Sequence, residues 1–146
     1  IPAELLNKPG KLTREEFEIM KTHTTIGADM LLELGRQHAG NPLLEYAYQI
    51  ARWHHERWDG KGYPDGLKGE DIPIAAQVVS VADVYDALTS ARVYKDAIPH
   101  EEAIQMILDG KCGQFNPLLL DCLLEVQDRI AETLARPADV VAFPTI

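Results

Sequence analysis

Cysteine is scarce in this sequence of 146 residues, which contains only two. Cys112 and Cys122 form no C-x-x-C pair, so the sequence predicts neither a zinc knuckle nor a disulfide framework. Thiols without a partner pattern are typical of a reducing compartment. We therefore expect a cytoplasmic protein.

Long hydrophobic runs and an excess of basic residues are also missing. No apolar run reaches the roughly 20 residues that a membrane-spanning helix needs, so no membrane segment is predicted in this chain. Lys and Arg number 14 against 23 Asp and Glu, which gives a net charge of −9. Without a basic stripe to displace counterions, the chain is not expected to bind nucleic acid. A small phosphorylated ligand stays compatible with this charge if a metal supplies positive charge.

The periodic segments predict an all-α fold, because nearly all of them have helical spacing and alternating strand patterns are scarce. We expect a bundle of about five main helices with a long irregular loop after the second. The length suits one domain, which we place at residues 1–136. The prolines and the loss of periodicity that follow predict a C-terminal tail over 137–146.

Capping signals and apolar spacing give the expected helix limits. Thr13 and Glu16 form a capping box that opens the first helix, whose apolar residues continue to Leu34. The second helix runs from about Pro42 to a pair of histidines, and an irregular segment extends to about Pro73. Asn116 and Pro117 give an N-cap and a first helical residue. The remaining helices are expected at about 75–88, 101–108 and 117–130.

A run with two histidines, an acid and several glycines is the most informative segment: His54-His55-Glu56-Arg57-Trp58-Asp59-Gly60-Lys61-Gly62-Tyr63-Pro64. Neutral imidazole is the commonest protein ligand for several divalent metals, and two consecutive imidazoles can take neighbouring coordination positions. The alternative is that both histidines only cap a helix C-terminus, where the dipole favours a cation. The adjoining glycine-rich turn favours a metal site with a loop above it.

Further candidate ligands fall on other predicted helices. His23 lies on the first helix and Asp83 on the third, and a bundle can bring such side chains together around a metal. We expect Asp83 to be buried among small apolar neighbours, where a carboxylate must be paired or bound to a metal. An N-cap or a core salt bridge is the alternative. His38 and His100 lie at a loop and a helix start, and we assign them no ligand role.

These residues resemble the HD-GYP domain, a branch of the HD superfamily of metal phosphohydrolases. The resemblance covers almost the whole chain to about residue 125. It rests on two long stretches, His54-His55-Glu56-x-x-Asp59-Gly60-x-Gly62-Tyr63-Pro64-x-Gly66-Leu67-x-Gly69-x-x-Ile72-Pro73 and Val81-Ala82-Asp83-x-x-Asp86-Ala87-Leu88-Thr89-Ser90. It implies an HD-type helical bundle and hydrolysis of the bacterial messenger cyclic di-GMP.

The resemblance also implies a metal centre with two or three ions in the intact domain, iron or manganese first. His23, His54 and His55 match the histidines that hold one metal, and Asp83 matches a ligand of its neighbour. A bridging hydroxide would then attack the phosphorus. Asp86 is the candidate for assisting proton transfer.

Ligand and partner contacts are implied as well. Arg92 and Lys95 match basic positions that contact phosphates, and a guanidinium suits phosphate oxygens in pairs. Without the resemblance they would be read as a solvated basic pair. Tyr63 offers an aromatic surface, which we assign to ligand binding. In the family the Gly-Tyr-Pro loop is linked to GGDEF-type cyclase partners; a purely structural turn is the alternative.

The chain departs from the family pattern in four places. A His-Asp pair, in a His-Asp-x-Gly-Lys segment that normally precedes these residues, is absent, and Ile1 stands in mid-pattern as if an element before it were missing. Gln77 stands where arginine is usual, Thr24 where proline often follows the histidine, and Asn116 where aspartate commonly precedes Pro117. Because a bridging ligand is lost, we expect this chain alone to be inactive.

Two functions of different classes follow from the sequence. The first is a metal-dependent phosphodiesterase domain whose intact parent hydrolyses cyclic di-GMP. The second is a non-catalytic module that binds cyclic di-GMP or a cyclase partner. A bundle that lacks some of its helices would expose an apolar face, which is also compatible with a homodimer.

Overall fold

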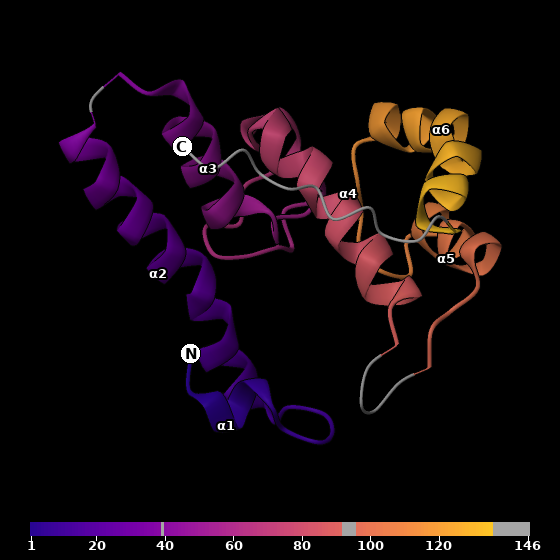
Figure 1. Ribbon diagram of the computed structural model, residues 1–146, viewed down its shortest axis with the longest axis horizontal. Coiled ribbons are helices and arrows are strands. Elements are labelled where there is room, and N and C mark those ends of the chain that lie inside the picture. The colour runs from indigo at the N-terminus through magenta and orange to yellow at the C-terminus, as the bar shows by residue number, and fades with distance from the viewer. Residues whose placement is uncertain (39, 92–95, 136–146) are drawn as a thin grey trace.

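The structure, a computed structural model, describes residues 1–38, 40–91 and 96–135 (Figure 1). Its helices are α1 (Ala3–Leu6), α2 (Arg14–Gln37), α3 (Pro42–Trp53), α4 (Ile74–Thr89), α5 (His100–Leu108) and α6 (Pro117–Ala135), with one 3-10 turn, η1 (Gly69–Asp71). The described residues form no strand of a sheet. The all-α prediction is therefore confirmed, and the predicted C-terminal tail lies outside the described residues.

The helices follow one another across the molecule (Figure 1). α2 and α3 run side by side in opposite directions, α4 packs against α3 in the middle, and α5 and α6 lie beyond α4. The segment between α3 and α4, predicted to be irregular, contains only the short η1 turn. The end of α3 and this irregular segment thus lie between one half of the fold, formed by α2 and α3, and the other half, formed by α4, α5 and α6.

Side-chain caps explain where three helices begin; those of α2 and α6 were predicted, and that of α3 was not. The Thr13 hydroxyl accepts from the Glu16 amide at 3.3 Å, and the Glu16 carboxylate accepts from the Thr13 amide at 2.6 Å, which completes the capping box of α2. Asn41 caps α3 through the Leu43 amide, and Asn116 caps α6 through the Leu118 amide. The sequence analysis did not predict the four-residue helix α1.

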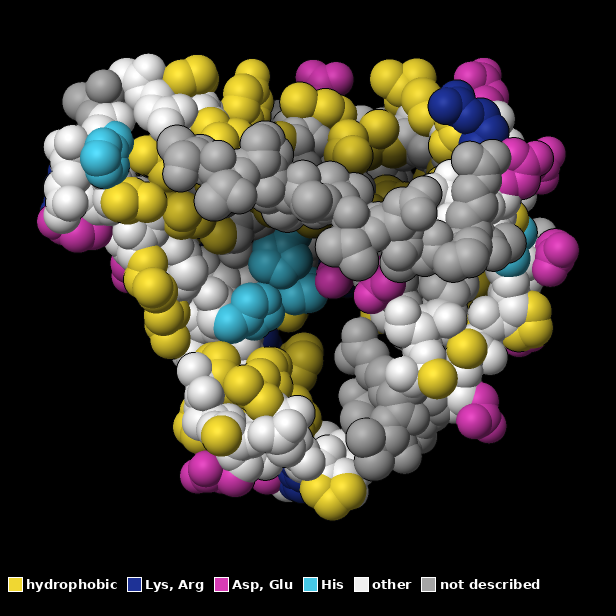
Figure 2. Space-filling view, in the orientation of Figure 1, with side chains coloured by type: hydrophobic (Ala, Val, Ile, Leu, Met, Phe, Trp, Pro, Cys, Tyr) yellow, Lys and Arg dark blue, Asp and Glu magenta, His cyan; other side chains and the backbone are white. Residues whose placement is uncertain are grey.

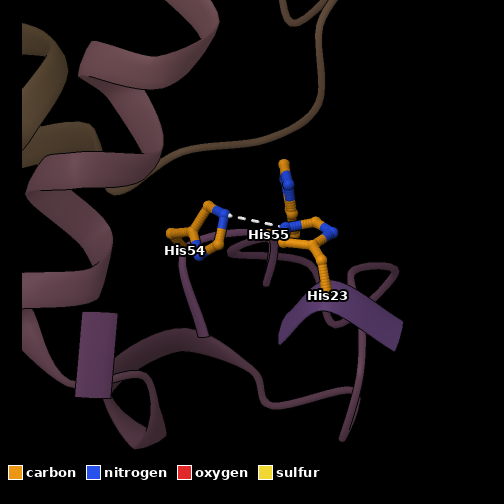
Figure 3. Close-up of side chains that lie close together, drawn as sticks. All are labelled: His23, His54 and His55. Carbon is orange, nitrogen blue, oxygen red and sulfur yellow. Dashed lines mark hydrogen bonds between the residues drawn. The ribbon is translucent and has the colours of Figure 1, made fainter. Parts of the chain in front are cut away.

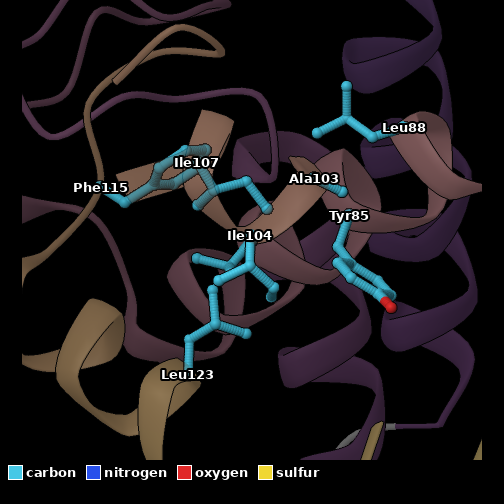
Figure 4. Packing of buried hydrophobic residues seen from close by; sticks show 8 residues of the cluster. Tyr85, Leu88, Ala103, Ile104, Ile107, Phe115 and Leu123 are labelled. Atoms are coloured by element: carbon cyan, nitrogen blue, oxygen red, sulfur yellow. The ribbon is translucent and has the colours of Figure 1, made fainter. Parts of the chain in front are cut away.

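The hydrophobic core lies in the half formed by α4, α5 and α6 (Figure 4). Its buried members are Val81, Tyr85, Leu88, Ala103, Ile104, Ile107, Phe115 and Leu123. By contrast, only Thr24 and Ala28 are buried in α2. Exposed apolar side chains of α2 include Ile19, Ile26, Met30 and Leu34. These residues share a stripe away from Thr24 and Ala28, so most of the apolar face predicted for this helix is left exposed. None of the described helices is long and apolar enough to cross a membrane.

Two of the departures from the family pattern are bonded to each other. The side-chain amide of Asn116 donates to Gln77 Oε1 at 2.9 Å, and Gln77 Nε2 donates to the carbonyl of Ile72 at 2.6 Å. Gln77 is buried, so each of these bonds satisfies a polar group that water cannot reach. A neutral amide pair thus stands where the resemblance described above implies arginine and aspartate. The positive charge that is missing at Gln77 is therefore accompanied by a missing negative charge at its partner, Asn116.

This pairing predicts a strong coupling between the two positions. Gln77→Arg alone buries a charge without a carboxylate and should lower the free energy of unfolding by more than about 2 kcal/mol. Adding Asn116→Asp should recover part of that loss, with a coupling energy of at least about 1 kcal/mol, because an aspartate can pair with the arginine and still cap α6. Urea unfolding of the wild type, the two single variants and the double variant measures this coupling energy. Asp121→Asn, on the exposed face of α6, should be additive with Gln77→Arg; additivity at Asn116 as well would contradict the prediction.

Candidate metal centre

Three histidines converge where α2 passes the end of α3 (Figure 3). His23 lies on α2, His54 is the C-cap residue of α3, and His55 follows it. Their candidate ligand atoms all lie within 4.8 Å of one another. In the space-filling view, histidine side chains line a hollow in this face of the molecule (Figure 2). The structure therefore brings together the three predicted imidazoles.

Hydrogen bonds fix the tautomers of two of these rings. The Nδ1 atom of His23 lies 2.7 Å from the carbonyl of Met20, and that of His54 lies 2.8 Å from the carbonyl of Ile50. Because a carbonyl can only accept, Nδ1 carries the proton in both rings, and the neutral form of each leaves a lone pair on Nε2. Each ring is thus presented to the hollow by the preceding turn of its own helix.

The two Nε2 atoms face each other at 3.3 Å (Figure 3). Two lone pairs repel at this distance unless a cation lies between them. Two nitrogens of one tetrahedral shell, each about 2.0–2.1 Å from a zinc-like metal, are about 3.4 Å apart. The donor set and its spacing therefore fit a divalent metal ion.

His55 supplies the third imidazole in its neutral form. Burial lowers its pKa to about 3, and the neighbouring His54 and His23 add to the effect. A metal needs an unprotonated ring nitrogen, so His55 does not have to lose a proton near neutral pH. The side chain is 19% exposed, which leaves it reachable from the hollow.

Asp83 differs from its prediction in one respect. Its Oδ2 atom lies 4.0 Å from Nδ1 of His55, so the carboxylate does face the cluster, but the side chain is 44% exposed rather than buried. The reason is helical phase: the buried stripe of α4 runs through Ser80, Val81 and Tyr85, and Asp83 lies beside it. The predicted burial was wrong, while the role as a ligand of a second metal stays a prediction.

Asp86, His38 and His100 do not belong to this cluster. Asp86 is exposed on α4 and accepts a hydrogen bond from the Ser90 hydroxyl at 3.1 Å. Arg92 and Lys95 lie outside the described residues. His38 is the C-cap residue of α2, and the Nδ1 atom of His100 lies 2.8 Å from the Tyr85 hydroxyl. Within the described part of the chain, only the three converging histidines form a group of metal-binding type.

A buried acid that the sequence analysis did not single out holds the loop. Glu56 is 2% exposed, and its Oε1 atom accepts from the amides of Asp65 and Gly66 at 2.7 and 3.0 Å. Burial raises the pKa of this carboxyl group. The residue belongs to the His-His-Glu run, but its partners are backbone amides, which carry no sequence signal. Glu56 ties the far side of the loop to the histidine pair.

Arg57 is the second residue that the sequence analysis passed over. Its guanidinium donates to the carbonyls of His54 and Glu56 at 3.3 and 2.9 Å and to the hydroxyl of Ser80 at 2.7 Å. The same group lies 5.3 Å from the ring centroid of Phe115. This side chain therefore joins the turn after α3 to α4 and to the segment before α6.

Asp65 closes the loop against α3. Its carboxylate accepts from Nε and Nη2 of Arg52 at 2.8 and 2.9 Å and from the indole of Trp53 at 2.8 Å. The Arg52 hydrogen bonds hold the pKa of Asp65 below its usual range, and the Trp53 bond adds to this. The loop is thus pinned to the last turn of the helix that delivers the histidine pair.

Comparison with known proteins agrees with this geometry. A family model described as HD domain matches residues 1–117. A cyclic di-GMP phosphodiesterase of Vibrio cholerae is 45% identical over 139 residues, 95% of this chain and 28% of that protein. One of Thermotoga maritima is 45% identical over 141 residues, 95% of the chain and 36% of the relative. A 3'3'-cGAMP-specific phosphodiesterase 2 of Vibrio cholerae is 41% identical over 128 residues, which are 88% of this chain and 24% of that protein. The chain therefore spans about a third or less of these relatives' length.

The contact between Asp65 and Arg52 predicts an acid-sensitive contribution to stability. Because the folded-state pKa of Asp65 lies below the value of about 3.9 in an unfolded chain, the contribution is fully present above about pH 4 and is lost as the pH falls through the folded-state pKa. Asp65→Asn should therefore lower the free energy of unfolding near pH 7, and the difference from wild type should shrink at lower pH. Urea unfolding between pH 3 and 7, in metal-free buffer, tests this. Asp121→Asn is the control, and a pH-independent difference for Asp65→Asn would contradict the prediction.

Removing one imidazole should weaken metal binding without unfolding the chain. His54→Ala is expected to lower the affinity for Mn²⁺ or Fe²⁺ by at least about tenfold, since it removes one of the facing Nε2 atoms. Metal retained after dialysis measures the loss, and far-ultraviolet circular dichroism reports the helices. His38→Ala, outside the cluster, should bind as the wild type does. Unfolding of His54→Ala would instead point to a structural histidine pair.

Proposed function

The chain belongs to the HD domain family, and we propose that it is the metal-dependent phosphodiesterase domain of a protein that hydrolyses cyclic di-GMP. The observation that carries the proposal is the pair of Nε2 atoms of His23 and His54, facing each other at 3.3 Å beside the neutral imidazole of His55. The names of the relatives from Vibrio cholerae and Thermotoga maritima support the choice of substrate.

The residues of this chain would divide the work as follows. The three histidines would hold one ion, and Asp83 would ligate a neighbouring ion from across His55. When bound, such ions stabilise negative charge on a phosphate and lower the pKa of water. We propose iron or manganese, because imidazole and carboxylate ligands suit both, and two or three ions in the intact domain.

Substrate contacts and proton transfer are proposed for residues beyond the cluster. Arg92 and Lys95 would bind phosphate oxygens. Asp86 follows Asp83 by one turn of α4, so it would approach the substrate from the same side as the proposed ligand and could pass a proton to the departing 3′ oxygen. Water adds across the phosphorus–oxygen bond, so the first product is a linear dinucleotide.

Partners and location extend the same proposal. A GGDEF-type partner would meet the outer part of the Gly-Tyr-Pro loop, where Lys61, Asp65 and Gly66 are exposed. A homodimer would use the exposed apolar stripe of α2, and the cytoplasm suits the two free cysteines. Each of these points stays a prediction.

Hydrolysis assays test the function directly. With added Mn²⁺ or Fe²⁺, the full-length gene product that contains this chain should convert cyclic di-GMP to the linear dinucleotide or GMP. His54→Ala should reduce the rate by about 10- to 100-fold or more, and His38→Ala should leave it unchanged. The 146-residue chain alone should show little turnover, because it lacks the His-Asp pair.

The outcomes separate the candidate functions. Faster turnover of 3'3'-cGAMP than of cyclic di-GMP would keep the phosphodiesterase and change its substrate. Binding of cyclic di-GMP without hydrolysis would favour the non-catalytic module instead. Neither binding nor hydrolysis by the full-length protein, with either metal, would contradict the proposal.

A further inference from the structure

Tyr63 is packed between the histidine cluster and helix α2. Its ring lies on that of His55, with centroids 4.7 Å apart and planes inclined by 29°. Phe17, near the start of α2, meets the tyrosine ring at 6.1 Å and at 84°. These are the stacked and edge-to-face arrangements that aromatic rings favour. The tyrosine ring thus connects α2 to the imidazole of His55.

Lys21 completes this packing from the same helix. Its Nζ atom lies 5.4 Å from the ring centroid of Phe17 and 5.6 Å from that of Tyr63, within the range of cation–π attraction. The Glu18 carboxylate pairs with the same ammonium at 2.7 Å. His23 follows Lys21 by two residues, so one short stretch of α2 supplies a candidate ligand and also supports the tyrosine.

The backbone on both sides of Tyr63 is held against the histidine pair. The Tyr63 amide donates to the carbonyl of His55 at 3.2 Å. At Gly62 a Cβ atom would overlap the backbone of residues 55–57, so only glycine allows this approach. On the other side, Glu56 binds the amides of Asp65 and Gly66. The position of the tyrosine ring is therefore determined by the loop as well as by its aromatic neighbours.

His55 differs from the other two histidines in how its ring is oriented. His23 and His54 each donate from Nδ1 to a backbone carbonyl. Among the described residues the His55 ring forms no such hydrogen bond, and Oδ2 of Asp83 lies 4.0 Å from its Nδ1 atom, which is too far for one. Histidines that bind metals almost always have their second nitrogen held by such a partner. The ring of His55 must be held by other means.

We infer that Tyr63 is the positioning residue for His55: its ring does by stacking what the carbonyls of Met20 and Ile50 do for the other two imidazoles. The inference rests on the metal site proposed above and concerns metal binding rather than turnover. It assigns the tyrosine of the Gly-Tyr-Pro loop to the interior of the site, in place of the ligand-binding surface expected from the sequence. The stack uses the ring and not the hydroxyl group, which makes phenylalanine the conservative replacement.

Binding of Co²⁺ to the full 146-residue chain tests this role, because the visible absorption of Co²⁺ reports the geometry of its ligands. Tyr63→Leu should weaken Co²⁺ binding by about 10- to 100-fold and change the absorption spectrum. Tyr63→Phe should keep both the spectrum and the affinity, within about threefold. Tyr46→Leu, at an exposed tyrosine of α3, is the matched control and should behave as the wild type.

The possible results distinguish this inference from the proposed function. Wild type that binds no Co²⁺ would overturn the metal site and the inference together. If the wild type binds Co²⁺ and Tyr63→Leu has the same spectrum and affinity, the inference alone is overturned. It is also overturned if Tyr63→Phe loses as much Co²⁺ affinity as Tyr63→Leu does. If Tyr63→Leu loses its helical circular dichroism, Phe17→Leu decides, because it removes only the outer support. Severalfold weaker binding is then expected, and unchanged binding would overturn the inference.

Discussion

The structure around the site depends on one turn, in which a buried acid, Glu56, and a partly buried base, Arg57, follow the histidine pair and bind different partners. Glu56 accepts hydrogen bonds from the loop at Asp65 and Gly66, while Arg57 donates to the turn itself and to Ser80 of α4. Withdrawing a polar side chain from water is costly unless it forms hydrogen bonds, so the bonds of Glu56 Oε1 and of the Arg57 guanidinium fix the elements that provide them. The histidines stand at the junction of these contacts. At Gly113 any side chain would collide with the Arg57 side chain, which extends the constraint to the segment before α6.

Local signals were sufficient to predict the five longer helices, α2 to α6, but not the four-residue helix α1. Caps at Thr13 and Asn116 are recognisable because their partners lie within a few residues, and their hydrogen bonds form as expected. The three imidazoles were predicted from the adjacent pair His54-His55 and from the resemblance to the HD-GYP pattern, in which His23 matches a third histidine. The pairing of Gln77 with Asn116 was not: the two residues are 39 positions apart, and a single sequence carries no covariation to join them.

The errors have a common physical origin in the assumption that apolar neighbours imply burial. Asp83 stands among small apolar residues, yet helical phase places it beside the buried stripe of α4. The apolar residues of α2 look like a core face, but the residues that are buried in this helix, which packs against α3, are Thr24 and Ala28. Periodicity determines which residues share a face, whereas the packing partner determines which face is buried. Roles such as those of Glu56 and Arg57 depend on backbone groups brought near by the fold, which residue types alone do not encode.

The uneven distribution of buried residues has a consequence for how this molecule opens. The core lies in α4, α5 and α6, and α2 buries only two small side chains. Segments with few buried apolar contacts detach at a lower free energy than the core does, and they exchange their amide hydrogens sooner. The histidine cluster spans this boundary, with His23 on the weakly held helix and His54 and His55 beside the stable half. An ion bound by all three rings would therefore link α2 to the stable half of the molecule, and slower amide hydrogen exchange in α2 would report that the ion is bound.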